Sequence, residues 1–195
     1  MNGGMMMQMN DYSLEIERLK NGIFDLRTRR FGTVAEIMIK KLYGLNESGT
    51  LAFDKRDMVT NARVEIKFST ALKKNEESIN DQNVFQQVMD ADYKTRAIFS
   101  YEAEIYDFDS NIQQIKGKEF DILYYGLFFW DQIEIFRVTR LEVLNFENYS
   151  NKQHRGNVGE GQFHLNRRNI GLHRDRFLQR VLSYQELYEL LKEEN

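Results

Sequence analysis

Two carboxylates and a lysine, at Asp57, Glu65 and Lys67, stand within one short segment of the sequence. If this segment is extended, alternate residues share a face, so Glu65 and Lys67 lie side by side while Ile66 packs into the core. Two carboxylates and the Ile66 carbonyl oxygen offer the hard oxygen ligands that Mg²⁺ prefers. Bound Mg²⁺ would polarise a phosphate and lower the pKa of water, with Lys67 either accepting the proton or stabilising charge. These residues at this spacing indicate metal-dependent hydrolysis of a phosphodiester.

The surroundings of the segment decide between a catalytic and a purely structural interpretation. Glu-x-Lys is a short pattern, and by itself a solvated strand face explains it as well. Here it is the only Glu-x-Lys of the chain, and Val64, Ile66 and Phe68 give the expected strand one apolar face. A segment that carries an aspartate precedes it across a short turn. This context favours the catalytic interpretation.

Helices and short strands are expected to position these residues. Apolar residues at steps of three and four predict a helix over residues 12–27. The capping-box spacing of Thr33 and Glu36 predicts a second helix from Thr33, ended by Gly44. The elements predicted next are strands over 51–53, 57–59 and 63–68, a turn at 60–62, a polar loop over 73–81 and a helix near 84–91.

The second half of the chain is expected to hold the centre of a sheet. The stretch 120–130 is so apolar that it predicts a strand buried on both faces. Further strands are predicted over 97–106 and 133–138, and Ser183 begins a capped helix near the end. Residues 146–180, rich in Asn, Gly, Arg and His, are predicted as a long basic loop region that contacts DNA or a partner.

Together these elements predict an α/β fold, a mixed β-sheet flanked by helices, in a single domain over residues 11–195. Residues 1–10, with repeated Met and no periodicity, are interpreted as a disordered start or the remnant of an expression tag. The sequence has no cysteine, which excludes disulfides and thiolate chemistry and suits a cytoplasmic location. The longest apolar stretch is about half of what a bilayer crossing needs, so no membrane association is expected.

Basic residues gather in the last third of a chain whose formal net charge is −3. Cationic and amide side chains bind phosphates and read base edges, so contact with DNA is the favoured interpretation, and a solvated basic surface is the alternative. The candidates for DNA contact are Arg155, Arg167, Arg168 and Arg174. His154, His164 and His173 offer a different, histidine-based metal site, but their irregular spacing argues against it.

The order of these features resembles the PD-(D/E)XK nuclease family, and within it the Type II restriction endonucleases. The resemblance covers about residues 12–143. It rests on Asp57 followed by Glu65-Ile66-Lys67-Phe68-Ser69, on the preceding helix with Glu36, on the following helix with Gln86, and on the strands over 120–143. It implies a restriction-endonuclease-like mixed sheet, Mg²⁺ as the cofactor, and metal ligands from Asp57, Glu65, the Ile66 carbonyl and Glu36.

Three positions have alternatives within this resemblance. Arg56 stands where the family often has proline, which leaves Asp54 open as the first carboxylate in place of Asp57. Glu36 is either the carboxylate that some members place near the metal or the capping partner of Thr33. Gln86 either orients water or phosphate or belongs to a solvated helix surface.

The resemblance implies a Type II site-specific deoxyribonuclease that acts on double-stranded DNA. One active site cuts one strand, so double-strand cleavage needs a second copy or a different partner. The small size and acidic net charge resemble the small catalytic subunit of a heterodimeric Type IIS enzyme, whose larger partner recognises the site and nicks the other strand. The alternatives are a self-sufficient homodimeric Type II enzyme, a repair or Holliday-junction nuclease of the same fold, and a non-enzymatic DNA-binding protein with an inert site.

Overall fold

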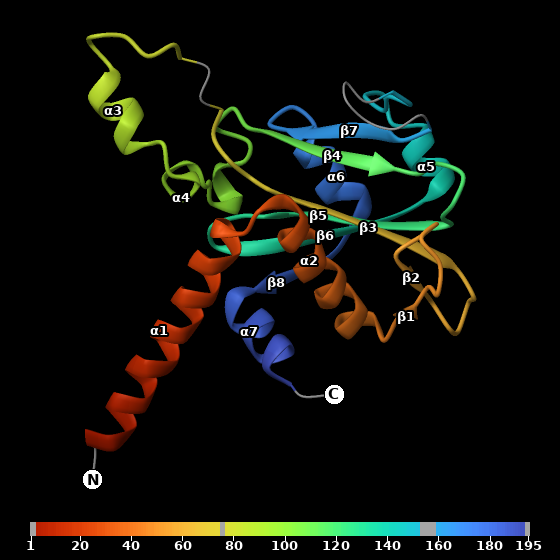
Figure 1. The fold of residues 1–195 in the computed structure, drawn as a ribbon, viewed down its shortest axis with the longest axis horizontal. Helices are drawn as coiled ribbons and strands as arrows, with labels where there is room; N and C mark the ends of the chain where they lie inside the picture. Colours follow the sequence, from red (N-terminus) through yellow and green to blue (C-terminus); the bar gives the residue numbers. More distant parts are fainter. Residues whose placement is uncertain (1–2, 75–76, 153–158, 194–195) are drawn as a thin grey trace.

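The computed structural model describes residues 3–74, 77–152 and 159–193, which form three layers (Figure 1). The middle layer is a mixed β-sheet. Helices α2 (Thr28–Tyr43) and α7 (Tyr184–Lys192), with the C-terminal part of α1 (Gly3–Asp25), cover one face of this sheet. The other face is covered by a smaller sheet and two short helices. The predicted fold class, α/β with a mixed sheet flanked by helices, is confirmed.

Within the described residues the central sheet has six strands in the order β1-β2-β3-β5-β6-β8. They are β1 (Asn46–Glu47), β2 (Lys55–Arg56), β3 (Arg63–Thr70), β5 (Ile122–Phe128), β6 (Gln132–Thr139) and β8 (Leu178–Ser183). β3 and β5 run parallel, and the other neighbours are antiparallel. Every residue of β5 is buried, which confirms the prediction of a central strand covered on both faces.

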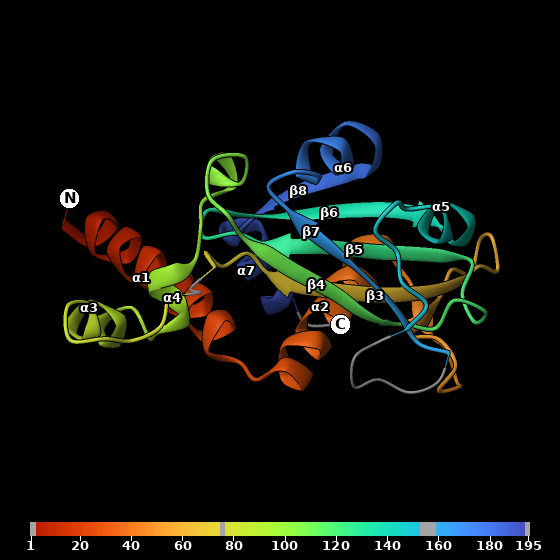
Figure 2. The ribbon, with the colours of Figure 1, turned by 90° about the horizontal axis from the view of Figure 1, so that it is seen from above.

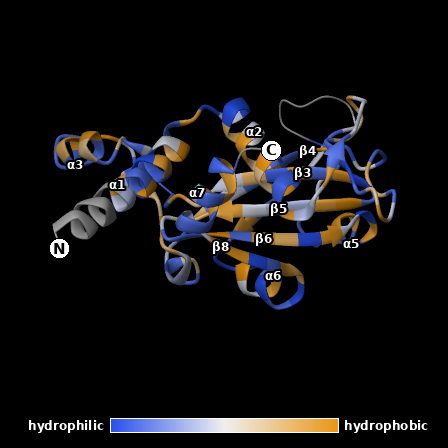
Figure 3. Ribbon diagram, turned by 90° about the horizontal axis from the view of Figure 1, so that it is seen from below, coloured by the Kyte–Doolittle hydropathy of each residue, from blue (hydrophilic) through white to orange (hydrophobic). Residues whose placement is uncertain are grey.

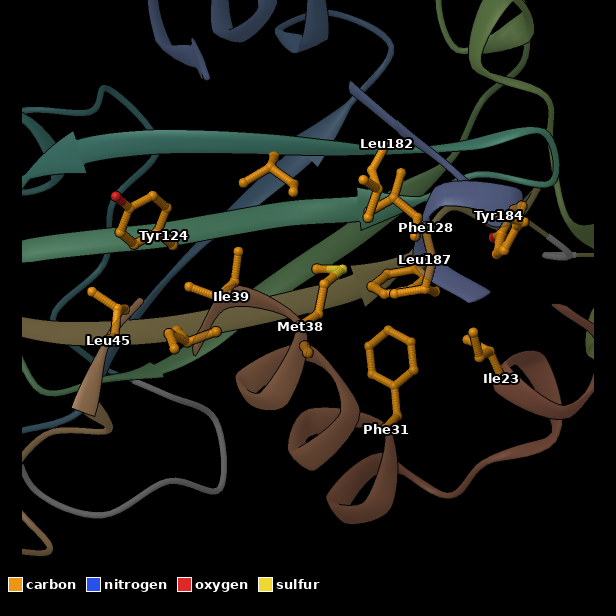
Figure 4. Close-up of a cluster of buried hydrophobic side chains, with 14 of the residues drawn as sticks. Ile23, Phe31, Met38, Ile39, Leu45, Tyr124, Phe128, Leu182, Tyr184 and Leu187 are labelled. Atoms are coloured by element: carbon orange, nitrogen blue, oxygen red, sulfur yellow. The ribbon is translucent and has the colours of Figure 1, made fainter. Parts of the chain in front are cut away.

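Helix α2 forms because its apolar residues recur on one face. Phe31, Ala35, Met38 and Ile39 are buried against the sheet and α7, as Figure 4 shows for most of this cluster. Gly44 ends the helix in a left-handed conformation, with φ 62°, that glycine adopts without strain. The helix begins at Thr28, earlier than the predicted start at Thr33.

The opposite face of the sheet is covered mainly by β-structure, where helices alone were expected. Strands β4 (Asp109–Ile115) and β7 (Gly161–Asn166) pair antiparallel. Helices α5 (Arg140–Leu144) and α6 (Ile170–Phe177) lie beside them. This layer buries the second core cluster against β5 and β6, with members such as Ile112, Phe163 and Leu165.

The loop predicted over residues 146–180 is therefore wrong for most of its length. β7 and α6 lie within it, and β8 begins before its end. In β7, Phe163 and Leu165 alternate with polar neighbours and are fully buried, while Ile170 anchors the start of α6. β7 has the usual two-residue period of a strand, but the polar composition of the region masked that period in the sequence. Residues 153–158 lie outside the described residues.

Two other local predictions are also wrong. Residues 97–106 form a short helical segment, η1 (Ser100–Glu102), in place of a strand. The Ser100 amide and hydroxyl both donate to the Asp131 carboxylate, at 2.7 Å each, and so hold this turn. The disordered start expected over 1–10 does not hold for residues 3–10, which continue α1 toward the N-terminus.

Short helices occupy one end of the molecule, opposite to β1 and β2 (Figures 1 and 2). α3 (Val84–Met89) confirms the helix predicted near 84–91, and α4 (Tyr93–Arg96) follows it. α3 has no buried residue although most of its side chains are apolar (Figure 3). At the chain's end, the predicted cap of α7 is confirmed by reciprocal hydrogen bonds between Ser183 and Glu186. No helix in the described part of the chain is long and apolar enough to cross a membrane.

Candidate active site

Strand β3 carries the predicted pair of Glu65 and Lys67 on one face. Val64 and Ile66, which alternate with them, are buried in the core formed with α2. Glu65 is buried to 1% exposure, and its Oε1 lies 2.7 Å from Lys67 Nζ. The predicted alternation of β3 is therefore confirmed, and the two charged side chains are in contact.

Asp54 completes this cluster from the segment just before β2. Its backbone N–H donates to the Val64 carbonyl at 3.0 Å, so the segment lies along the edge of β3. Its Oδ2 accepts from the Ile66 N–H at 2.8 Å and lies 3.2 Å from Lys67 Nζ. Because the N–H and C=O of one strand residue point to the same side, the Ile66 carbonyl faces the Asp54 edge.

The Glu65 carboxylate is short of partners for a buried group. Neither of its oxygens has a hydrogen-bond partner within the described ranges. The Lys67 ammonium, 2.7 Å from Oε1, faces this carboxylate as a charged neighbour. Burial raises the pKa of Glu65 to about 7, and the Asp54 charge adds to the rise while Lys67 and Lys116 oppose it.

Lys67 stays charged in this setting. Burial alone would lower the pKa of Lys67, but the carboxylates of Glu65 and Asp54 outweigh burial and raise it. A lysine held between two carboxylates is a positive charge fixed in position.

Glu36 reaches the same cluster from helix α2. Its Oε2 lies 3.6 Å from the Nζ of Lys55, a buried lysine that also pairs with Glu47 at 2.8 Å. Burial and the nearby Asp54 raise the pKa of Glu36, and Lys55 and Lys67 partly oppose them.

The alternative interpretation of Glu36 as a capping residue is wrong. Thr33 lies inside α2, and its hydroxyl donates to the Arg29 carbonyl at 3.2 Å. The helical period extends upstream through Phe31, so the first turn of the helix forms before Thr33.

Asp57 is not brought to the cluster, contrary to the prediction. Its Oδ1 accepts from the N–H groups of Val59 at 2.9 Å and Thr60 at 3.2 Å. Those backbone bonds lower the pKa of the Asp57 carboxyl. The strand predicted over 57–59 is a turn, and Asp57 shapes this turn while Asp54 faces Glu65 and Lys67.

The remaining predicted residues lie elsewhere. Gln86 is on α3, at the far end of the molecule, where it donates to Asp90 at 2.9 Å. Arg167 pairs with Asp107 at 3.1 Å, and Arg168 is exposed beside it. Both follow Asn166, which pairs with Asp109 at the end of β4 away from Lys116. Arg155 lies outside the described residues.

Arg174 is a structural residue and not a free DNA contact. Its guanidinium forms two hydrogen bonds with the buried Glu134, at 3.0 and 2.9 Å. It also donates to the Ser100 carbonyl at 2.7 Å and to Glu104 at 3.1 Å. These contacts use the donors that a phosphate would need.

The two histidines within the described residues, His164 and His173, do not converge on one position. His164 pairs with Asp109 at 3.0 Å. His173 is buried against Tyr125, whose hydroxyl lies 2.6 Å from His173 Nδ1, and burial lowers the pKa of His173 to about 4. His154 lies outside the described residues.

Lys116 and Lys55 lie near the candidate site, and the sequence did not point to them. Lys116 follows β4 and donates to the Leu51 carbonyl at 2.6 Å, in the loop that leads to Asp54. Its charge also acts on Glu65. A prediction of β4 would have been needed to find it, and that strand was missed.

The donor set suits a hard divalent cation. Asp54 bonds the Ile66 N–H, Asp54 and Glu65 both contact Lys67, and the buried Glu65 oxygens have unused acceptor capacity. In the described ranges, no three His, Asp or Glu side chains already surround one position suited to a metal. The fit therefore rests on two carboxylates and a backbone carbonyl, with Glu36 close by.

Comparison with known proteins adds no assignment. Neither a scan against models of known families nor a search of curated proteins found a match.

Proposed function

We propose that this chain is a Mg²⁺-dependent endonuclease that hydrolyses phosphodiester bonds of double-stranded DNA, of the PD-(D/E)XK restriction-enzyme type. The observation that carries the proposal is the contact of Lys67 with both Asp54 and Glu65 at the edge of β3, where the buried Glu65 oxygens lack hydrogen bonds. The family's order of elements supports it: a helix with Glu36, then an aspartate, then Glu-x-Lys on a strand. Asp54 takes the first carboxylate position in place of Asp57.

Each residue has a defined part in this proposal. Asp54, Glu65 and the Ile66 carbonyl would hold Mg²⁺, with Glu36 close enough to take part. When bound, Mg²⁺ supplies Lewis-acid stabilisation and lowers the pKa of water. Lys67 would place a positive charge beside the scissile phosphate, and Lys55 pairs with Glu36. Lys116 fixes the loop before Asp54 through the Leu51 carbonyl.

Cleavage of supercoiled plasmid tests this function directly. The wild-type chain is expected to nick plasmid in Mg²⁺ and to bind without cutting in Ca²⁺, which fits oxygen sites more loosely and activates water less well. Equal rates in both ions would contradict the mechanism. Zinc-dependent cutting that disappears in His164→Ala would instead support a histidine site.

We also propose that double-strand cleavage needs a partner, and we favour a larger recognition subunit over a second copy. A single site cuts one strand, and the chain's net charge of −3 suits weak binding of DNA by itself. The loop before α3 and the helix itself expose large apolar side chains, as protein-contact surfaces do. They are Ile79, Val84, Phe85, Val88 and Met89. A DNA-cleaving enzyme of this kind acts in the cytoplasm, the location we propose.

Plasmid assays with the purified chain, alone and with proteins encoded beside it, test the partner proposal. Nicking alone and double-strand cleavage in the mixture are expected. Efficient double-strand cutting by a homodimer would refute the larger partner and leave the nuclease proposal intact.

A further inference from the structure

The turn between β2 and β3 exposes two apolar side chains at its tip. Met58 is 64% exposed and Val59 is 96% exposed. Isolated apolar residues on a surface are common, but two adjacent ones at the tip of a turn leave much apolar area in water. Asp57 and Thr60 flank them.

This tip is held rigidly from within. Asp57 Oδ1 accepts from the Val59 and Thr60 amides, and the Asp57 amide donates to the Ala62 carbonyl at 3.0 Å. Arg56 donates to Asn61 Oδ1 at 2.6 Å, and Asn61 adopts a positive φ of 58°. Most polar groups of the turn are therefore bonded inward. Met58 and Val59 are the large apolar side chains that this turn leaves exposed to solvent.

The tip belongs to the same hairpin as the carboxylate cluster. Met58 follows Asp54 by four positions, and the same hairpin carries Glu65 on its second strand. Three arginines and two aspartates stand near the base of the tip. Arg56 ends β2 and donates to Asn61, the exposed Arg137 acts on Asp57, and Arg63 pairs with Asp121. The negative charge of Asp57 is turned toward backbone amides.

The size of the tip limits what it can bind. A stable protein interface buries about 800 Å² on each partner, far more than two side chains provide. Apolar side chains on a rigid support are what proteins insert between base steps of DNA, where they replace part of the stacking. The exposed Arg137 is the adjacent cation suited to a flanking phosphate, because Arg63 is already paired with Asp121 and Arg56 with Asn61.

We propose that Met58 and Val59 form an apolar wedge that enters the minor groove and unstacks a base step beside the scissile phosphate. The inference rests on the proposed nuclease function and adds a mode of substrate binding to it. The wedge would bend the duplex at the site and bring the phosphate to Asp54 and Glu65. Asp57, which the sequence suggested as a metal ligand, would instead serve by holding the wedge.

Permanganate oxidation of thymines tests the wedge, because it attacks thymines that are unstacked. Supercoiled plasmid is incubated in Ca²⁺ with wild-type protein, Met58→Ser/Val59→Ser, and the conservative variant Met58→Leu/Val59→Ile. Leu14→Ser is the matched control, since Leu14 is 60% exposed on α1, away from the hairpin. Nicking in Mg²⁺ is measured in parallel as KM and kcat.

New reactive thymines are expected with wild type, the conservative variant and the control, and not with the serine double variant. The serine variant should also raise KM at least tenfold while kcat changes less. Unchanged thymine reactivity and KM in that variant would overturn the wedge and leave the nuclease proposal standing. Failure of the wild-type chain to nick in Mg²⁺ would overturn the nuclease proposal, a separate outcome.

Discussion

Glu65 on β3 and Glu134 on β6 are two buried glutamates of the same sheet, each beside a cation. Their exposures are 1% and 3%. Arg174 donates to both oxygens of Glu134, and Gln132 adds a third bond at 3.3 Å. Arg174 itself is also bonded to Glu104 and the Ser100 carbonyl. This network is closed, because its charges are paired inside the protein.

Glu65 presents the opposite case. Its neighbour Lys67 is a point charge shared with Asp54, and neither Glu65 oxygen has a hydrogen bond within the described residues. A guanidinium satisfies a carboxylate with two parallel bonds, whereas an ammonium leaves acceptor capacity unused. An incompletely satisfied buried carboxylate costs stability, and such a cost is typical of functional sites. The comparison separates a charge pair that supports the fold from one suited to bind a ligand.

The largest expected effect is on cleavage, in Glu65→Ala. Loss of a metal ligand should lower the nicking rate by about a thousand-fold or more, since the metal is worth several kcal/mol to the transition state. Stability should change little, because the cost of burying this carboxylate is removed while Lys67 keeps Asp54 as a partner. Plasmid nicking and urea unfolding measure the two quantities. Cutting near the wild-type rate would refute the assignment of Glu65.

Glu134→Ala should show the reverse pattern. Removal of Glu134 leaves the partly buried Arg174 without its main partner, which costs about 3 kcal/mol, the lower end of the usual range because Glu104 and Ser100 still accept from it. Activity per folded molecule should be retained at low temperature. The double variant Glu134→Leu/Arg174→Met is the control and should recover most of the loss. If Glu134→Ala were as stable as the wild type, the Glu134–Arg174 pair would not support the fold, and its contrast with Glu65 and Lys67 would be lost.

In the absence of DNA, the two glutamates should also differ in how much Ca²⁺ stabilises their variants against unfolding. This effect is smaller than the two above. Ca²⁺ at tenfold excess over its Kd should stabilise the wild type by about 1.4 kcal/mol. Glu134→Leu/Arg174→Met should gain the same amount, and Glu65→Gln much less. Thermal unfolding with increasing Ca²⁺ measures these gains, and an equal gain in Glu65→Gln would place the metal elsewhere.

The stabilisation of the wild type by Ca²⁺ should depend on pH. The pKa of Glu65 is about 7, so below pH 7 Ca²⁺ competes with a proton on this carboxyl and its stabilising effect shrinks. Without metal, the effect of pH on stability has the opposite sign. The folded state holds that proton more tightly than the unfolded state, so the contribution of Glu65 to stability falls as pH rises from about 5 through 7. An effect of Ca²⁺ that is constant from pH 5 to pH 8 would contradict the role of Glu65.

The sequence predicted the parts of this comparison that depend on local periodicity. Alternation in β3 placed Glu65 beside Lys67, and an uninterrupted apolar run identified β5. The choice between Asp54 and Asp57 depended on the register of the hairpin. That register follows from the hydrogen bonds of Asp57 and the positive φ of Asn61, which no period reveals.

Long-range pairing explains the other misses. Arg174 appeared to be a free cation because Glu134, Glu104 and Ser100 lie far from it in the sequence. β7 was missed because its outward positions are polar and its surroundings are rich in Asn and Arg. Without β4 and β7, the position of Lys116 beside the loop that leads to Asp54 was also out of reach.

The smallest expected effect tests the choice between the two aspartates. Asp57→Ala removes two hydrogen bonds to backbone amides of an exposed turn, which should cost about 1 kcal/mol of stability. Because a loosened tip binds DNA less well, KM should rise by roughly fivefold, the factor that 1 kcal/mol represents.

Asp54→Ala should instead abolish nicking and Ca²⁺ stabilisation together, since Asp54 contacts Lys67 and the Ile66 amide at the cluster. Steady-state nicking rates of the two variants, measured side by side, decide whether Asp54 or Asp57 is the metal ligand. If Asp57→Ala were inactive and Asp54→Ala nearly normal, the metal ligand would be Asp57, and the hairpin would have to change register when it binds metal.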